Sequence, residues 1–112
     1  MKKQQKKANI NFQITLDLNN VPENIEWHAS DNKETNKSAK AVMISIWDGI
    51  DKKSLKIDLW TKEMMAEEMQ FFTVQILDSL SETYKRSVGD EKISLEIKKF
   101  AQKIGKMSNV LK

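Results

Sequence analysis

The sequence predicts one α+β domain, a four-stranded antiparallel meander sheet followed by two helices packed on one face. Apolar and polar residues alternate through most of the first 60 positions, whereas apolar residues recur every three or four positions after residue 61. Strands that all precede the helices are typical of α+β rather than α/β folds. A chain of 112 residues has room for one domain of ordinary size. We therefore assign residues 1–8 to a flexible lysine-rich tail and residues 9–112 to a single domain.

The strands are predicted at residues 10–18, 24–29, 39–48 and 54–60. Every second residue from Ile10 to Leu18 is apolar, which is typical of a half-buried strand. Asparagine and proline in the segment 19–23 indicate a turn, and segment 30–38 has no large apolar residue and indicates a loop. The short connections between the later strands favour antiparallel pairing throughout.

The helices are predicted at residues 62–88 and 91–108. Thr61 stands just before the change of period and is expected to cap the first helix, since a threonine oxygen can accept an N–H of the first turn. Gly89 suits the end of that helix, and Asp90 suits the start of the next. Each helix carries one apolar stripe, formed by Met65, Met69, Phe72, Ile76, Leu80 and Tyr84 in the first and by Ile93, Ile97, Phe100, Ile104, Met107 and Leu111 in the second.

Composition and charge exclude several classes of protein. The chain has no cysteine, which excludes disulfide scaffolds and thiolate metal sites, and no apolar run approaches the ~20 residues of a membrane span. The net charge of +3 comes from the tail, where four lysines occur in the first seven residues, so the remainder is close to neutral. No arginine or aromatic residue accompanies those lysines, and we expect no nucleic-acid binding. The basic start lacks the apolar core of a secretory signal, which favours a cytoplasmic protein.

No pattern in the chain indicates an enzyme, a cofactor site or a metal site. His28 is the single histidine and lies near Glu26, Ser30 and Asp31, but these residues surround the predicted end of a strand and are interpreted as surface side chains. The segment Asp48–Asp51 lacks the alternating oxygen ligands of a calcium loop and indicates a turn. We therefore expect a non-enzymatic protein.

Met43, Trp47 and Trp60 are the candidate partner-binding residues. Within the third and fourth strands they lie out of phase with the uniformly apolar positions, which include Ile44 and Ile57. If the helices cover those positions, the three side chains point outward and form an aromatic surface for a partner. The alternative is that a bulge or the turn into the helix returns Trp47 or Trp60 to the core.

Several segments resemble the gliding-motility protein GldC family over about residues 8–105. They are Ile25-Glu26-Trp27, Ala39-Lys40-Ala41, Ser45-Ile46-Trp47-Asp48, the stretch from Leu55 to Met64, Glu68-Met69 and Gly89-Asp90. The resemblance implies an accessory protein of bacterial gliding and of the linked type IX secretion machinery, with no established binding residues to carry over. We expect an adaptor that contacts a protein of that machinery, with a homo-oligomer left open. The alternative is a SecB-like chaperone or peptide-binding module, which rests on element order alone.

Overall fold

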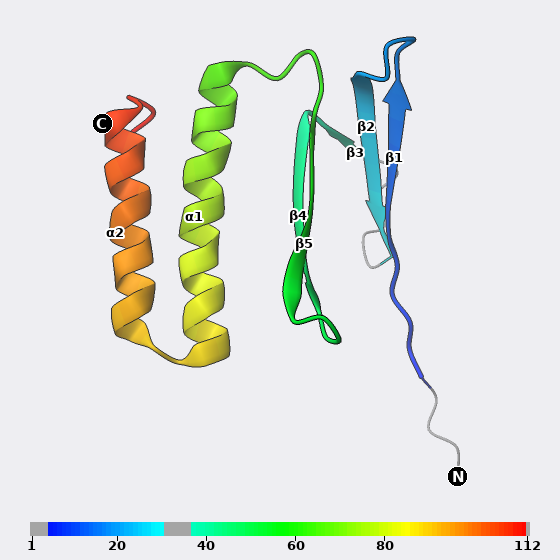
Figure 1. Ribbon diagram of the computed structural model, residues 1–112. Helices are drawn as coiled ribbons and strands as arrows, with labels where there is room; N and C mark the ends of the chain where they lie inside the picture. Colours follow the sequence, from blue (N-terminus) through cyan, green and yellow to red (C-terminus); the bar gives the residue numbers. More distant parts are fainter. Residues whose placement is uncertain (1–4, 31–36, 112) are drawn as a thin grey trace. The chain divides into compact units, whose positions relative to one another are not determined.

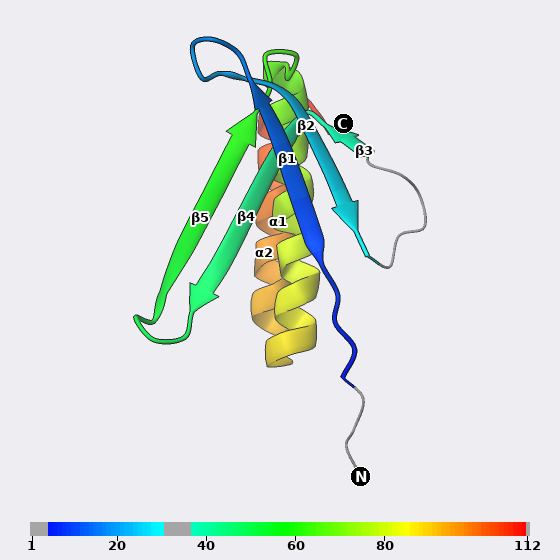
Figure 2. The ribbon, with the colours of Figure 1, turned by 90° about the vertical axis from the view of Figure 1, so that its right-hand side faces the viewer.

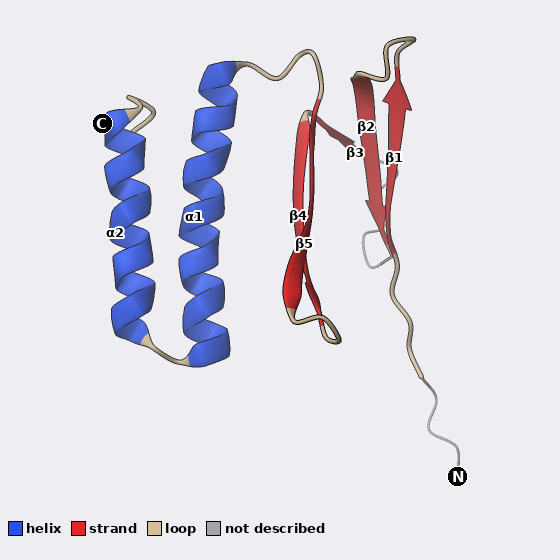
Figure 3. Ribbon diagram, in the orientation of Figure 1, coloured by secondary structure: helices blue, strands red, loops and turns tan. Residues whose placement is uncertain are grey.

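A computed structural model describes residues 5–30 and 37–111 of the chain. It divides into two compact units, one of strands that ends at Met64 and one of helices that begins at Met65. Figure 3 shows this segregation, with all strands preceding both helices, so the α+β class is confirmed. Residues 1–4 of the predicted tail and residues 31–36 of the predicted loop lie outside the described residues. The expected packing of the helices on the sheet stays a prediction.

The first sheet has three antiparallel strands in the order β1 (Ile10–Leu16), β2 (Pro22–Ala29) and β3 (Lys37–Ala39). β1 and β2 run side by side in opposite directions (Figure 1). Ile25 is completely buried and lies opposite Ile14 on one side and Ala39 on the other. This central isoleucine is the core of the sheet. β3 was not predicted, because it has no apolar alternation and is extended through its pairing with β2.

The second sheet is a hairpin of β4 (Ala41–Asp48) and β5 (Lys53–Trp60) (Figure 2). The prediction of one four-stranded sheet with a continuous strand at 39–48 is therefore wrong. The backbone bends at Lys40, and this bend separates β3, which pairs with β2, from β4, which pairs with β5. Strands still pair in chain order as in a meander, but in two sheets.

The turn between β1 and β2 is longer than the alternation predicts. β1 ends at Leu16 rather than at residue 18, and β2 begins at Pro22 rather than at residue 24. The carboxylate of Asp17 explains the early end, since its Oδ1 accepts the backbone N–H groups of Asn19 at 2.8 Å and of Val21 at 2.9 Å. The Asp17 side chain thus satisfies two backbone N–H groups of the turn, which need no partner on a neighbouring strand.

The helical unit consists of α1 (Ala66–Val88) and α2 (Glu91–Met107). The predicted start at residue 62 with Thr61 as the cap is wrong. The residue before α1 is Met65, whose N–H donates to Glu68 Oε1 at 3.2 Å. The predicted junction is confirmed, because Gly89 adopts the left-handed conformation with φ 81° and Asp90 Oδ1 accepts the N–H of Ile93.

Small residues allow the two helices to approach each other closely. The buried positions are Val74 and Ser81 on α1 and Ser94, Ala101 and Gly105 on α2. The Ser94 hydroxyl donates to the Ser81 carbonyl at 2.7 Å, which satisfies both buried groups across the interface. The prediction that Leu111 continues the stripe of α2 is wrong, because the helix ends at Met107 and Leu111 packs back over Gly105, where a Cβ would collide with its side chain. The interface is thus built from small residues and one buried hydrogen bond.

The predicted apolar stripes of α1 and α2 lie beside this interface rather than in it. On a helical wheel both stripes are rotated in the same sense away from the small residues, so in an antiparallel pair they share one side of the hairpin. Leu80, Ile93 and Phe100, for example, are 49%, 45% and 50% exposed. The helical unit therefore presents a broad apolar face that the two helices do not themselves cover.

Candidate protein-binding surface

The register of the β4–β5 hairpin places Met43, Trp47 and Trp60 on one face. Trp60 pairs with Ala41, two residues from Met43, and Trp47 pairs with Ser54. Because alternate residues of a strand share a face and directly paired residues point to the same side, all three side chains project from the same surface. Met43 is 40% exposed, Trp47 65% and Trp60 56%. On the opposite face Ile46, Leu55 and Ile57 are about half exposed as well, so the expectation that the helices cover that face and leave the tryptophans outward stays a prediction.

The three side chains nevertheless do not form one continuous patch. Lys56 and Asp58 occupy the same face between the two tryptophans, and Lys56 Nζ lies 3.2 Å from Asp58 Oδ2. Trp60 and Met43 are near the bend at Lys40, whereas Trp47 is four residues farther along β4, about 13 Å at the usual rise of a strand. The structure therefore brings Met43 and Trp60 together and leaves Trp47 separate.

A hollow of about 280 Å³ lies beside Trp60. It is lined by the turn residues Asn20, Val21 and Pro22 and by Asp58, Leu59 and Trp60 at the end of β5. Two segments of the strand unit that are almost 40 residues apart in the chain thus form the hollow together. Sequence reasoning missed Val21 and Pro22, which it interpreted as part of a turn alone. The available signal was an apolar pair inside an otherwise polar turn.

A salt bridge joins Lys62, two residues after Trp60, to the turn that lines the hollow. Lys62 Nζ lies 2.5 Å from Asp17 Oδ2 and 3.8 Å from Glu23 Oε1. The hydrogen bond from Lys62 is the largest cause that lowers the pKa of Asp17, and the backbone N–H of Val21 lowers it further. The same hydrogen bond raises the pKa of Lys62. The pair therefore stabilises the folded turn when Asp17 is ionised and Lys62 is protonated.

Thr61 anchors the other side of Trp60. It is 4% exposed, and its N–H donates to the Lys40 carbonyl at 2.8 Å. Among the described residues, its buried Oγ1 has no hydrogen-bond partner. With the neighbouring residues Thr61 and Lys62 both tied down, Trp60 is held on a defined backbone rather than on a free loop. This reduces the entropy lost when a partner binds.

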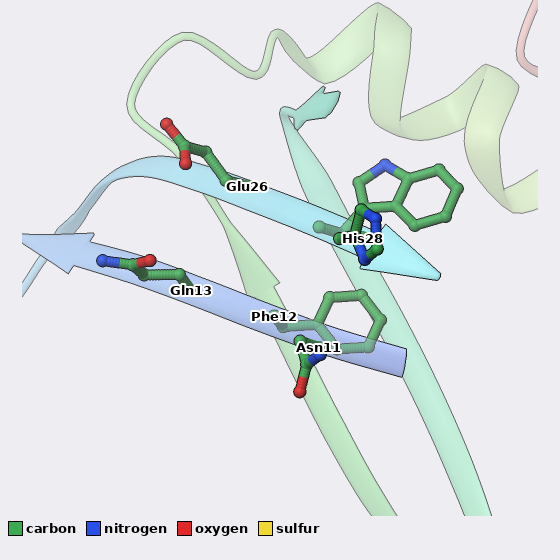
Figure 4. A pocket seen from close by; sticks show the side chains of 6 residues that line it. Asn11, Phe12, Gln13, Glu26 and His28 are labelled. Atoms are coloured by element: carbon green, nitrogen blue, oxygen red, sulfur yellow. The ribbon is translucent and has the colours of Figure 1, made fainter. Parts of the chain in front are cut away.

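A second hollow, also about 280 Å³, lies on β1 and β2 (Figure 4). The register places His28 opposite Asn11 and Glu26 opposite Gln13, so four polar side chains share this face. Ser30 does not lie free beside His28, because its Oγ accepts the N–H of Asn9 at 3.0 Å. Asp31 is outside the described residues, and within residues 5–30 and 37–111 no group of three acidic or histidine side chains is placed to hold a metal ion. The expectation of a non-enzymatic protein stays a prediction.

Comparison with protein families gives a match that covers most of this structure. The family model described as gliding motility-associated protein GldC-like matches residues 22–110. The chain belongs to the GldC-like family. The matched range includes β2, the β4–β5 hairpin with Trp60, and both helices, whereas β1 precedes it. The resemblance noted in the sequence is therefore confirmed, and the family description associates the chain with gliding motility.

No curated protein and no solved structure matched the chain. Neither helix in the described part of this GldC-like chain is long and apolar enough to cross a membrane.

Proposed function

We propose that this GldC-like chain is a non-enzymatic, cytoplasmic adaptor that binds a protein of the gliding apparatus and the linked type IX secretion machinery. The observation that carries the proposal is the exposed indole of Trp60 beside its hollow. Tryptophan is enriched among the few residues that dominate binding energy, and such residues tend to pair with a pocket on the partner. Trp60 and the hollow supply both the anchor and the pocket on one surface.

The dimensions and chemistry of the hollow define what it accepts. A volume of about 280 Å³, with Val21, Pro22 and Leu59 in the lining, suits one or two apolar side chains of a partner. Asp58 and Asn20 add polar groups, as does the rim of a typical interface. The partner segment is thus expected to insert an aliphatic or aromatic residue beside Trp60 and to make polar contacts around it.

The two tryptophans of the hairpin provide a matched test. Trp60→Ala and Trp47→Ala each remove an exposed indole from the same face, but only Trp60 lines the hollow. Both variants and the unmodified chain are used as bait in native cells, after circular dichroism shows that each is folded. We expect Trp60→Ala to lose one stoichiometric partner, with affinity reduced about 30-fold or more as for a typical hot spot. Trp47→Ala is expected to retain that partner.

Other results would contradict the proposal in distinct ways. Retention of every partner by Trp60→Ala would exclude the hollow as the binding site. Loss of the partner only with Trp47→Ala would move the site to the far end of the hairpin. Binding of many unrelated unfolded chains by all three baits would contradict a specific adaptor.

The broad apolar face of the helical unit favours one alternative, a SecB-like chaperone or peptide-binding module. Such a surface can bind apolar segments of unfolded chains without a defined sequence. This alternative predicts that the protein suppresses aggregation of an unrelated unfolded test protein, and that Phe100→Ser weakens the suppression while Trp60→Ala does not. An adaptor shows no such activity.

A further inference from the structure

β1 is an edge strand whose outer side is open. In the described sheet it hydrogen-bonds to β2 and to no other strand. The Asn9 carbonyl accepts the N–H of Ser30, and in the same register Ile10 lies opposite Ala29. Since hydrogen-bonded and non-hydrogen-bonded pairs alternate in an antiparallel ladder, Ile10, Phe12 and Ile14 direct their N–H and C=O groups away from β2. These groups form a free template for a further strand.

The devices that normally protect such an edge are missing from β1. Natural edge strands carry lysine or proline, or are very short. β1 has seven residues, and the segment 8–16 contains no charged residue and no proline in a chain with 31% charged residues. Six of the seven β1 residues are exposed. An open, uncharged edge of this length is expected to have a partner.

We propose that the partner is a second copy of β1, paired antiparallel across a twofold axis at Gln13, so that two three-stranded sheets become one six-stranded sheet. In this register Phe12 of each copy lies opposite Ile14 of the other, and Asn11 lies opposite Thr15. Apolar residues therefore meet apolar residues on one face and polar residues meet on the other, as an isologous interface requires. Because β1 is uncharged, self-pairing opposes no like charges.

Charge on either side of β1 favours the same arrangement. Lys6 and Lys7 precede the strand. Asp17 and Glu23 lie at its other end together with Lys62, which pairs with both carboxylates, so these three side chains carry a net charge of −1. Antiparallel pairing places the basic end of one copy beside the acidic end of the other, twice per dimer. A parallel pairing would bring lysines together with lysines. The flanking charges are thus opposite in sign in the antiparallel pair of identical strands and alike in the parallel pair.

The absence of native cysteine makes the register testable by disulfide formation. In the proposed dimer the two Gln13 residues form a non-hydrogen-bonded pair, with Cα atoms about 4.5 Å apart, which is within the range of a disulfide. Gln13→Cys is therefore expected to oxidise rapidly to a covalent dimer. Thr15→Cys is the matched control, because it is also exposed on the polar face but its two copies would lie about 13 Å apart.

The experiment combines sedimentation of the unmodified full chain with oxidation of the two variants. We expect a reversible dimer of twice 13.0 kDa at micromolar concentration, and at least tenfold faster covalent dimer formation by Gln13→Cys than by Thr15→Cys.

Gln13→Lys, which places two like charges at the axis, is expected to weaken the dimer at least tenfold, whereas Gln13→Asn leaves it intact. A monomer at 100 µM (roughly a hundredfold above the expected range), equal oxidation rates, or an unchanged dimer in Gln13→Lys would each overturn the proposal. Binding at Trp60 is measured separately, so failure of one proposal leaves the other intact.

Discussion

Replacement of Ile25 by alanine is expected to destabilise the strand unit strongly. Ile25 is completely buried at the centre of the three-stranded sheet, with Ile14 and Ala39 as its cross-strand neighbours. The change removes three buried carbon atoms, worth roughly 2.4 kcal/mol at about 0.8 kcal/mol for each buried methylene. The ladders to β1 and β3 hold the backbone apart, so part of the cavity persists and adds to the loss. We expect a decrease of about 3 kcal/mol in the free energy of unfolding.

The three tryptophans provide the assay for this change. Trp27, Trp47 and Trp60 all lie in the strand unit, so urea unfolding followed by tryptophan fluorescence reports on that unit, while circular dichroism at 222 nm follows the helices. For a slope of about 1–3 kcal/mol per molar urea, the fluorescence midpoint is expected to fall by roughly 1–3 M.

Ile50 is the matched control because it undergoes the same chemical change at an exposed position. It is 89% exposed in the turn between β4 and β5, and Ile50→Ala is expected to change the stability by less than about 0.5 kcal/mol. If Ile25→Ala cost less than about 1 kcal/mol, or no more than Ile50→Ala, Ile25 would not be the core of the sheet.

Three further predictions concern a buried hydroxyl, a helix end and a turn. Ser94→Ala is expected to lower helical stability by about 1 kcal/mol by thermal unfolding, whereas Ser87→Ala, at an exposed position, has little effect. Gly89→Ala forces a side chain into the left-handed region and is expected to cost about 1 kcal/mol, and Gly49→Ala should be near neutral; equal costs would contradict this reason. Because the pKa of Asp17 is lowered on folding, its stabilisation is complete above the unfolded pKa, near 3.8, and lost as pH falls through the lower folded value. Asp17→Asn should therefore reduce acid sensitivity in that range, and an unchanged profile would contradict the assignment.

The sequence predicted the elements whose signal is local. The period of the apolar residues identified both helices, and the conformational preferences of Gly89 and Asp90 located the junction between them. The four main strands follow from alternation. Parity also grouped Met43, Trp47 and Trp60 on one face of the hairpin, as the register of β4 and β5 does. Their role in partner binding stays a prediction, because Ile46, Leu55 and Ile57 on the opposite face are exposed as well.

The parts that sequence reasoning missed depend on contacts between distant residues. The bend at Lys40 falls inside a segment that alternates normally, and β3 is extended by pairing with β2 rather than by its own composition. Thr61 resembles a helix cap in the sequence, but its N–H bonds to the Lys40 carbonyl 21 residues earlier. The hollow beside Trp60 requires the β1–β2 turn, which no local pattern associates with β5.

Within the strand unit and within the helical unit, the main packing contacts of the described elements join chain neighbours, namely β1 with β2, β2 with β3, β4 with β5, and α1 with α2. Within each unit, such local connectivity favours rapid folding. During synthesis each hairpin can close as soon as its second arm has left the ribosome. Every residue that lines or braces the Trp60 hollow precedes Met65. The whole segment that forms the proposed partner-binding surface is therefore synthesised before either helix.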